Sequence, residues 1–186
     1  KLVEAGKKNY VGFELPGRTL GVIGLGKLGR KVAQVAAALG MKVVAWSPNL
    51  TPERCAEAGV IYAGKDELFT QADVISIHMV LSDRTRGLVT RDDLARMKPT
   101  AYLINTARAP IVDEAALLDV LTRGAIAGAG LDVFAQEPLR RDHPGENSLL
   151  YQRPVDRLSG VFRRRDPQPP VDLLHPVDPR HRGQAA

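Results

Sequence analysis

Residues 18–40, RTLGVIGLGKLGRKVAQVAAALG, constrain the fold more than any other stretch of this chain. A short apolar run at 18–23 predicts a buried strand, and apolar residues at helical spacing over 27–39 predict a helix that stops at Gly40. Between the two lies the glycine-rich turn GLGKLG at 24–29. A strand that enters a helix through such a turn predicts the first unit of a parallel sheet with crossover helices.

The alternation of apolar strands and amphipathic helices continues toward residue 134. We expect further strands at 41–46, 73–78, 101–105 and within 127–134, and helices after the N-cap Thr51, at 66–71, at 90–97 after a capping box of Thr90 and Asp93, and at 113–123. Such a pattern forms parallel βαβ units, whose helices cover both faces of the sheet. The predicted fold is α/β, a doubly wound parallel sheet of the Rossmann type.

The turn at 24–29 has the GxGxxG spacing of a dinucleotide-binding loop. Gly24 permits the tight turn, Gly26 lets the backbone approach a pyrophosphate, and Gly29 lets helix and strand pack closely. The helix N-terminus then faces the phosphates with free N–H groups. The alternative is a glycine turn with no ligand, which the position between a strand and a helix makes the weaker interpretation.

The end of the second predicted strand bears on which dinucleotide binds. An acid about 20 residues beyond the glycine turn usually holds the ribose of NAD, but this sequence has Ser47 there, in AWSPNL. A hydroxyl can bond a ribose without repelling a 2′-phosphate, and Arg54 follows closely enough to attract one. We expect NAD as the cofactor, with NADP not excluded.

Two further residues follow later strands, at the edge of an open α/β sheet where ligands bind. Arg108 lies in INTARAPIVDEAAL and Glu137 in AGAGLDVFAQEPL. Either one alone is best interpreted as a solvated loop charge, as most Arg and Glu are. Together with the glycine turn, however, they predict a site. His78 ends the third strand and is interpreted as structural.

Composition excludes other classes of protein. The 186 residues carry a net charge of +5, but +3 of it lies in the last 36 residues, and the remainder shows no basic stripe typical of nucleic-acid binders. No apolar run reaches the roughly 18 residues that a membrane span needs, and no signal segment opens the chain. We therefore expect a cytoplasmic protein that binds neither nucleic acid nor membrane, with no metal and an inert thiol at Cys55.

The motifs resemble the nucleotide-binding domain of the D-isomer-specific 2-hydroxyacid dehydrogenases. The resemblance runs from about residue 17 to about residue 150, through GRTLGVIGLGKLGR, DVISIHMVLSDRTRGLV, MKPTAYLINTARAPIVDEAAL and GLDVFAQEPL in the same order. It implies reversible hydride transfer between a nicotinamide and C2 of a small 2-oxo or 2-hydroxy acid. It also implies a homodimer, because these enzymes usually pair two nucleotide domains.

The resemblance further implies roles for individual residues. Arg108 would grip the substrate carboxylate, and Glu137 would hydrogen-bond a protonated His that gives its proton to the substrate oxygen. Other cofactor contacts would come from Lys27 and Leu28 at the pyrophosphate, Met79 and Val80 at the adenosine, and Thr106, Ala107 and Asp132, beside Arg108, at the nicotinamide. Ala109 stands where the family usually has Gly, so a positive φ there would be strained.

The resemblance ends near residue 148. The family's proton donor is a His in a Pro-His-x-Gly stretch after an apolar strand, whereas here YQRP follows Leu150. Neither His143 in RRDHPG, nor His175 or His181 further on, is expected to replace it. We therefore expect a lead-in at 1–16, a dinucleotide-binding domain at 17–150 and a disordered Pro/Arg-rich tail at 151–186, with the substrate domain largely absent.

Two questions follow from this change. The tail is hypothesised to be an out-of-frame translation that starts near codons 144–151, the alternatives being a truncated variant or an authentic divergent tail. The leading functional interpretation is an NAD-dependent 2-hydroxyacid dehydrogenase whose chain binds the dinucleotide but lacks the catalytic His. The alternative is a non-catalytic NAD(H)-binding regulator or an inactive fragment.

Overall fold

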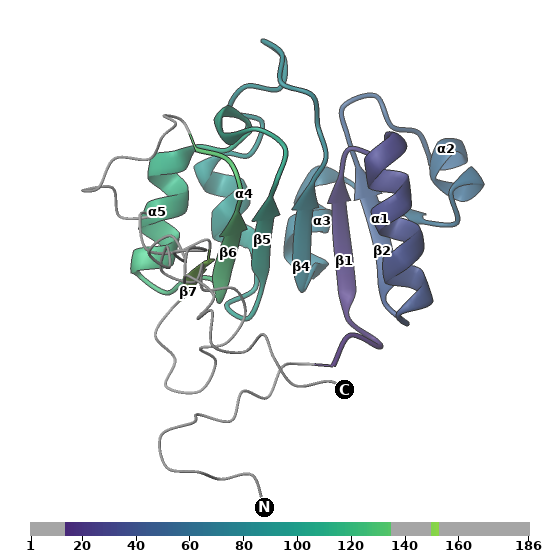
Figure 1. The fold of residues 1–186 in the computed structure, drawn as a ribbon, viewed down its shortest axis with the longest axis horizontal. Helices are drawn as coiled ribbons and strands as arrows, with labels where there is room; N and C mark the ends of the chain where they lie inside the picture. Colours follow the sequence, from purple (N-terminus) through teal and green to yellow (C-terminus); the bar gives the residue numbers. More distant parts are fainter. Residues whose placement is uncertain (1–13, 135–149, 153–186) are drawn as a thin grey trace, which may run out of the picture.

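The structure, a computed structural model, describes residues 14–134 and 150–152 (Figure 1). The strands are β1 (Thr19–Ile23), β2 (Lys42–Trp46), β3 (Ile61–Tyr62), β4 (Val74–Ile77), β5 (Tyr102–Asn105), β6 (Gly128–Leu131) and β7 (Leu150–Gln152). The helices are α1 (Lys27–Ala38), α2 (Pro52–Glu57), α3 (Lys65–Gln71), α4 (Arg91–Arg96) and α5 (Glu114–Thr122), with a 3-10 turn, η1 (Ala109–Ile111).

The strands form one sheet in the order β3-β2-β1-β4-β5-β6-β7. The first six are parallel, and β7 pairs antiparallel with β6 at the edge. This strand order, with the crossover from β3 to β4, is that of a doubly wound dinucleotide-binding sheet. The predicted Rossmann-type fold is therefore confirmed.

The register of the parallel strands brings their carboxyl ends level with one another. Ile23 at the end of β1 lies opposite Trp46 of β2 and Ile77 of β4. Asn105 of β5 in turn lies between Ile77 and Leu131 of β6. The loops that follow these five strands therefore leave one edge of the sheet, where open α/β sheets bind their ligands.

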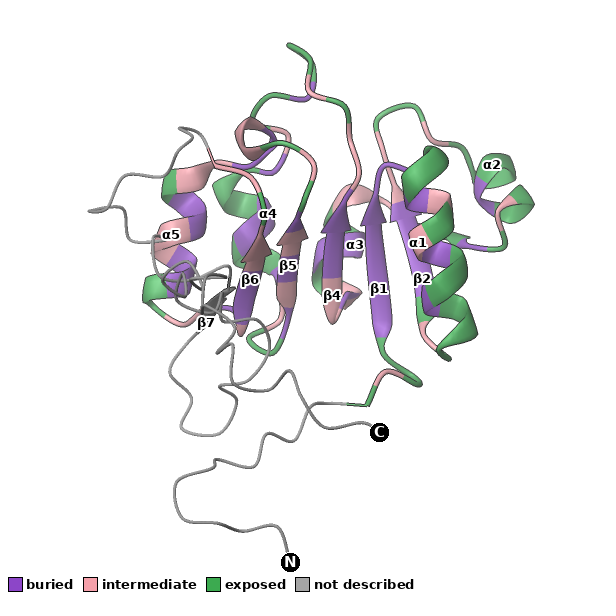
Figure 2. Cartoon of the chain, in the orientation of Figure 1, coloured by how far each residue is buried: buried purple, intermediate pink, exposed green. Residues whose placement is uncertain are grey.

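Two apolar cores lie on opposite faces of the sheet. One joins β1 and β2 to α1 and α2 through residues such as Val22, Ala33 and Cys55. The other joins the sheet to α3, α4 and α5 through residues such as Phe69 and Leu103. Figure 2 shows the buried strands between these layers. Among the described residues, no helix covers β4, β5 and β6 on the face that carries α1 (Figure 1).

The predicted helix starts agree with the structure. The Thr51 hydroxyl accepts the N–H of Arg54 at the start of α2. At the start of α4, Asp93 and Thr90 form the predicted capping box, with the Thr90 N–H donating to the carboxylate at 2.7 Å. The sequence pattern did not predict β3 or η1, because elements of two and three residues are too short to show a period.

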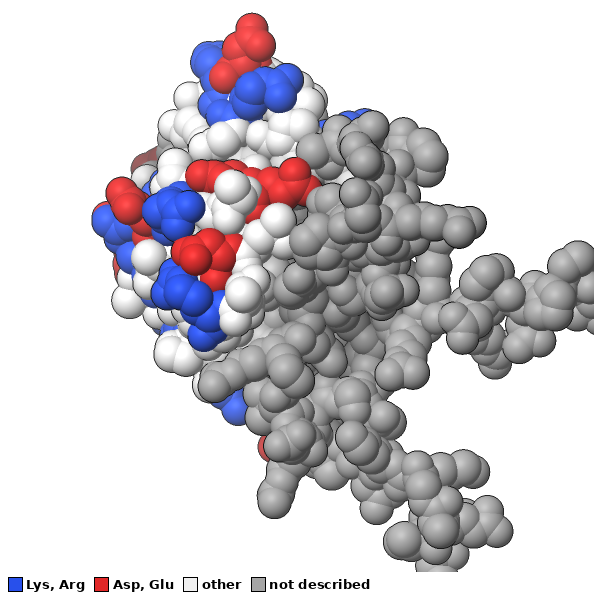
Figure 3. Space-filling view, turned by 90° about the vertical axis from the view of Figure 1, so that its left-hand side faces the viewer, with Lys and Arg blue, Asp and Glu red and all other residues white. Residues whose placement is uncertain are grey.

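The described surface carries charged side chains of both signs (Figure 3). Within residues 14–134 and 150–152, no helix is long and apolar enough to cross a membrane, and no group of metal-ligating side chains occurs. Figure 3 shows acidic and basic side chains interspersed on the side of the molecule that carries α5. Ion pairs of this kind join Asp119 to Arg91 and to Arg123, each at 2.9 Å.

Candidate functional site

The first and third glycines of the turn are required by the fold itself. Gly24 has φ of 98°, a conformation that side chains rarely adopt, and a Cβ there would lie 2.8 Å from the carbonyl oxygen of His78. A Cβ on Gly29 would overlap the carbonyl oxygen of Gly24. Both glycines therefore hold the start of α1 tightly against the ends of β1 and β4.

The second glycine is different, because no contact within the described part of the chain requires it. Gly26 has φ of −81°, and a Cβ there would meet no atom within 4 Å. As the N-cap of α1 it offers no side-chain acceptor, and the first turn contains no acid. The first N–H groups of this 12-residue helix therefore have no side-chain acceptor at the N-cap, and N–H groups in this position bind anions. Lys27 and Leu28, both exposed, lie at this end of the helix.

The end of β2 lies beside the glycine turn. The Trp46 carbonyl accepts the N–H of Gly24 at 2.9 Å, so the half-buried Ser47 follows directly beside the turn. The N–H of Leu50 donates to the carbonyl oxygen of Ser47 at 3.0 Å, and this turn fixes the backbone of Ser47. Residues 47–51 contain no carboxylate, and Arg54 is exposed in α2. These residues fit a ribose and place no negative charge against a 2′-phosphate.

The residues after β4 adjoin the same turn. The Met79 sulfur lies 2.7 Å from where a Cβ of Gly24 would be, which places Met79 against the glycine turn. Val80 follows with 82% of its surface exposed. Thr85 holds this loop, because its hydroxyl donates to the carbonyl of Val80 at 2.7 Å. The sequence-predicted adenosine contacts thus adjoin the predicted pyrophosphate site.

The loop after β5 presents Arg108. Thr106 and Arg108 are exposed, whereas Ala107 between them is half-buried. The Arg108 backbone is extended, and its Nη1 donates to the carbonyl oxygen of Ala107 at 2.6 Å. Ala109 begins η1, and a 3-10 turn has negative φ, so the strain that a positive φ would cause does not arise there.

The loop after β6 meets the loop after β5. The N–H of Asp132 donates to the carbonyl oxygen of Asn105 at 3.1 Å, and Asp132 is exposed beside the predicted nicotinamide end. Glu137, the second predicted catalytic residue, lies outside the described residues. So do most of the predicted tail and His143, His175 and His181. The short strand β7 crosses the domain boundary expected at residue 150 by two residues.

Two titratable groups were interpreted as structural, and their surroundings agree with this. The Nε2 atom of His78 lies 2.9 Å from the hydroxyl of Ser76, and burial lowers the pKa of His78 below its ordinary value. A neutral imidazole that is half-buried in this way is a poor proton donor. Burial raises the pKa of the Cys55 thiol, which is 1% exposed, so little reactive thiolate forms.

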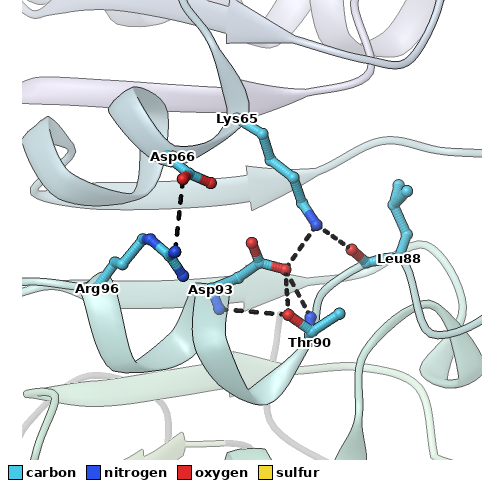
Figure 4. Close-up of polar contacts among 6 residues, drawn as sticks. All are labelled: Lys65, Asp66, Leu88, Thr90, Asp93 and Arg96. Carbon is cyan, nitrogen blue, oxygen red and sulfur yellow. Dashed lines mark hydrogen bonds and ion pairs between the residues drawn. The ribbon is translucent and has the colours of Figure 1, made fainter.

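Two features near the site were not predicted. The buried side chain of Asn105 bonds the backbone of the Arg108 loop, and the asparagine in INTAR was the only signal for it, because this residue often closes local turns. Lys65 at the start of α3 pairs with Asp93 at 2.6 Å and donates to the carbonyl of Leu88 at 2.7 Å (Figure 4). The contacts of Lys65 join residues far apart in sequence, so no local sequence pattern predicts them.

Comparison with known proteins agrees with this geometry. The family model described as "D-isomer specific 2-hydroxyacid dehydrogenase, NAD binding domain" matches residues 2–151. A D-3-phosphoglycerate dehydrogenase of Synechocystis sp. is 46% identical over 148 residues, which are 80% of this chain and 27% of that protein. A glyoxylate reductase of Aeropyrum pernix is 43% identical over 134 residues, 72% of this chain and 40% of that protein.

Solved structures show the same likeness. A phosphoglycerate oxidoreductase from Vibrio cholerae has a TM-score of 0.68 and 39% identity, covering 72% of this chain and 43% of that one. An NAD-complexed D-isomer specific 2-hydroxyacid dehydrogenase from Lactobacillus delbrueckii has a TM-score of 0.63 and 38% identity. The match covers 73% of this chain and 40% of that one. The chain thus spans well under half the length of these relatives. Since the family model covers most of it, the chain belongs to the D-isomer-specific 2-hydroxyacid dehydrogenase family and carries its NAD-binding domain.

Proposed function

We propose that the protein containing this chain transfers a hydride reversibly between NAD(H) and C2 of a small 2-oxo or 2-hydroxy acid. The observation that carries the proposal is the register of the parallel strands, which pairs the residues at their carboxyl ends: Ile23, Trp46, Ile77, Asn105 and Leu131. It aligns the uncapped N-terminus of α1 and the Arg108 loop along one edge, the arrangement in which a dinucleotide lies across such a sheet. Relatives named for glyoxylate and for phosphoglycerate support the substrate class.

The cofactor would be held mainly through its two phosphates. The free N–H groups that follow Gly26 would bind the pyrophosphate, and the positive end of the α1 dipole would add to the attraction. Ser47 would bond the adenosine ribose. The remaining contacts are assigned to Lys27 and Leu28 beside the phosphates, Met79 and Val80 beside the adenosine, and Thr106, Ala107 and Asp132 beside the nicotinamide, which supplies or accepts the hydride when bound.

Arg108 would bind the substrate. Among the described residues no carboxylate pairs with Arg108, and only its Nη1 is engaged, with the carbonyl of Ala107. Its remaining donors can form a bidentate pair with the carboxylate of a 2-oxo acid. The same positive charge would stabilise the negative charge that develops on the 2-oxo oxygen as the hydride adds to C2.

Proton transfer is the step that separates the two candidate functions. Glu137 is assigned to hold a protonated His, but the residues after Leu150 read YQRP, without the family's Pro-His-x-Gly stretch. This sequence is the observation that favours the alternative, a non-catalytic NAD(H)-binding regulator or an inactive fragment. If the tail is out of frame, another reading frame of the same DNA restores that stretch. Resequencing the gene tests this, and two other frames without it would contradict the frame hypothesis.

The oligomeric state and the cellular location of the protein are part of the same proposal. We propose a cytoplasmic homodimer, supported by the family's habit of pairing nucleotide domains rather than by any contact within the described residues. Gel filtration with light scattering on the full-length gene product tests the dimer. A monomer at the concentration used for the activity assay would contradict it.

The reaction itself is tested with the full-length gene product. NADH consumption is followed by absorbance with glyoxylate and with the 2-oxo acid derived from phosphoglycerate, in wild-type protein and in Arg108→Gln. We expect turnover of one of these acids, and a loss of roughly 10²–10³-fold in kcat/KM in the variant, as for removal of one oxyanion donor. Tight NADH binding without turnover would instead support the regulator, and neither binding nor turnover would support the inactive fragment.

A further inference from the structure

The side chain of Asn105 lies at the centre of the loop that presents Arg108. Asn105 ends β5 and is 2% exposed. Its Oδ1 accepts the N–H of Ala107 at 3.1 Å, and its Nδ2 donates to the carbonyl oxygen of Arg108 at 3.0 Å. Both bonds go to the backbone, so Asn105 acts on where Arg108 is placed and not on its guanidinium.

Only an amide of this length meets both requirements. The Ala107 N–H needs an acceptor and the Arg108 carbonyl needs a donor, and an asparagine supplies one of each. An ionised Asp would keep the acceptor but place a second oxygen against the Arg108 carbonyl. An apolar residue would leave the Ala107 N–H and the Arg108 carbonyl, which now form part-buried bonds, without these partners, and that costs free energy.

The far end of the same loop is held independently. The N–H of Gly87 donates to the carbonyl of Pro110 at 2.8 Å, and that of Val89 donates to the carbonyl of Ile111 at 3.0 Å. The segment 87–90 is itself held by Lys65, through the Leu88 carbonyl (Figure 4). The backbone is thus fixed at both ends, and the exposed Arg108 lies in the loop between them.

We propose that Asn105 is a positioning residue for substrate binding, which rests on the function proposed above. Its amide fixes the peptide of Arg108 so that the guanidinium meets the substrate carboxylate at the nicotinamide end of the site. Loss of the Nδ2 bond lets that peptide turn and moves the guanidinium. A displacement on the order of 1 Å at a substrate-positioning group costs roughly 100-fold in rate.

The test uses the full-length protein with three variants. Asn105→Asp removes the donor to Arg108 while keeping the acceptor for Ala107, and Asn105→Ser shortens the side chain so that it cannot span both groups. The control, Asp73→Asn, weakens a buried network at the opposite edge of the sheet, where the carboxylate accepts from the Thr19 N–H and from Lys98. For each variant, kcat, KM for the 2-oxo acid, the dissociation constant of NADH and the melting temperature are measured.

We expect both Asn105 variants to lose roughly 100-fold in kcat/KM for the 2-oxo acid, mainly through KM, with NADH binding unchanged in Asn105→Asp, which keeps the acceptor for the Ala107 N–H. Asp73→Asn should lower the melting temperature without this loss. Acidification should restore part of the activity of Asn105→Asp relative to wild type, because a protonated carboxyl can again donate to the Arg108 carbonyl. The neighbouring charges, Arg108 and Asp132, are the same in both proteins.

Three results would overturn the inference. Asn105 variants that melt earlier but keep the wild-type KM, while Arg108→Gln loses activity, would show that Asn105 serves only stability and would leave the proposed function intact. A wild-type protein that turns over no 2-oxo acid would overturn the proposed function, and this inference with it. An Asn105→Asp variant with no relative recovery at low pH would also contradict the role of the Nδ2 donor.

Discussion

Gly29 of α1 lies so close to the carbonyl of Gly24 that a methyl group on Gly29 would overlap its oxygen. We expect Gly29→Ala to destabilise the fold by about 3 kcal/mol, because the backbone of the turn must move to admit the methyl group. Gly26→Ala is the matched control, since its methyl group meets no atom within 4 Å, and it should cost less than about 1 kcal/mol. Urea unfolding of both variants checks this, and equal losses would contradict the close packing.

Ser47, the residue proposed to bond the adenosine ribose, carries no negative charge. We expect Ser47→Asp to weaken NADPH binding relative to NADH by about tenfold or more, because a carboxylate at the ribose repels a 2′-phosphate. Fluorescence titration with both dinucleotides measures the ratio. Asn49→Asp adds the same charge two residues further along an exposed turn and should change the ratio less. A ratio that Ser47→Asp leaves unchanged would show that the ribose lies elsewhere.

Figure 4 shows two ion pairs between α3 and α4, and the two pairs differ in burial. Lys65 pairs with Asp93, whose side chain is 4% exposed, whereas Arg96 pairs with Asp66 at 3.4 Å with 40% and 71% exposure. We expect Lys65→Met to destabilise the protein by about 2 kcal/mol, because it removes a charged partner from a buried carboxylate. Arg96→Met should cost less than about 1 kcal/mol. Denaturant unfolding that ranks the two variants the other way would be inconsistent with the structure.

His78 should make stability depend on pH. Burial lowers its pKa below 6.5, so the unfolded chain binds a proton first as pH falls. Stability from His78 is therefore fully present above pH 6.5 and is lost as pH falls through the lower pKa of the folded state. We expect His78→Gln to flatten the stability profile in this window, measured by denaturant titration at several pH values. Parallel wild-type and variant profiles would mean that His78 is not buried as described.

The sequence predicted the fold wherever a local pattern encodes it. The strand and helix of the first unit, the caps Thr51 and Thr90 and the spacing of Gly24, Gly26 and Gly29 are all local, and each agrees with the structure. A separate role was predicted for each of the three glycines, and the surroundings of Gly24 and Gly29 agree with the tight turn and the close packing predicted for them. Helix and strand ends differ from the prediction by about one residue, as is usual for frayed termini.

The rest depends on contacts between residues far apart in sequence. Asn105 was interpreted only as the end of a strand, because its partners follow it in a loop whose path the periodicity does not show. Lys65 reaches Leu88 across 23 residues, which only the packed structure reveals. The role of Glu137 stays a prediction, since it lies outside the described residues.

The central claim is that the open N-terminus of α1 at Gly26 binds a dinucleotide, and Trp46 can report on it directly. Trp46 is the only tryptophan, and its carbonyl accepts the Gly24 N–H at 2.9 Å. We expect NADH to quench its fluorescence with energy transfer to the nicotinamide, and Gly26→Ala to raise the dissociation constant by about tenfold or more, equivalent to 1.4 kcal/mol. Gly64→Ala, at the N-cap of α3, where an added Cβ also meets no atom within 4 Å, should bind NADH as wild type does. No energy transfer in wild type, or equal binding by Gly26→Ala and Gly64→Ala, would contradict the account.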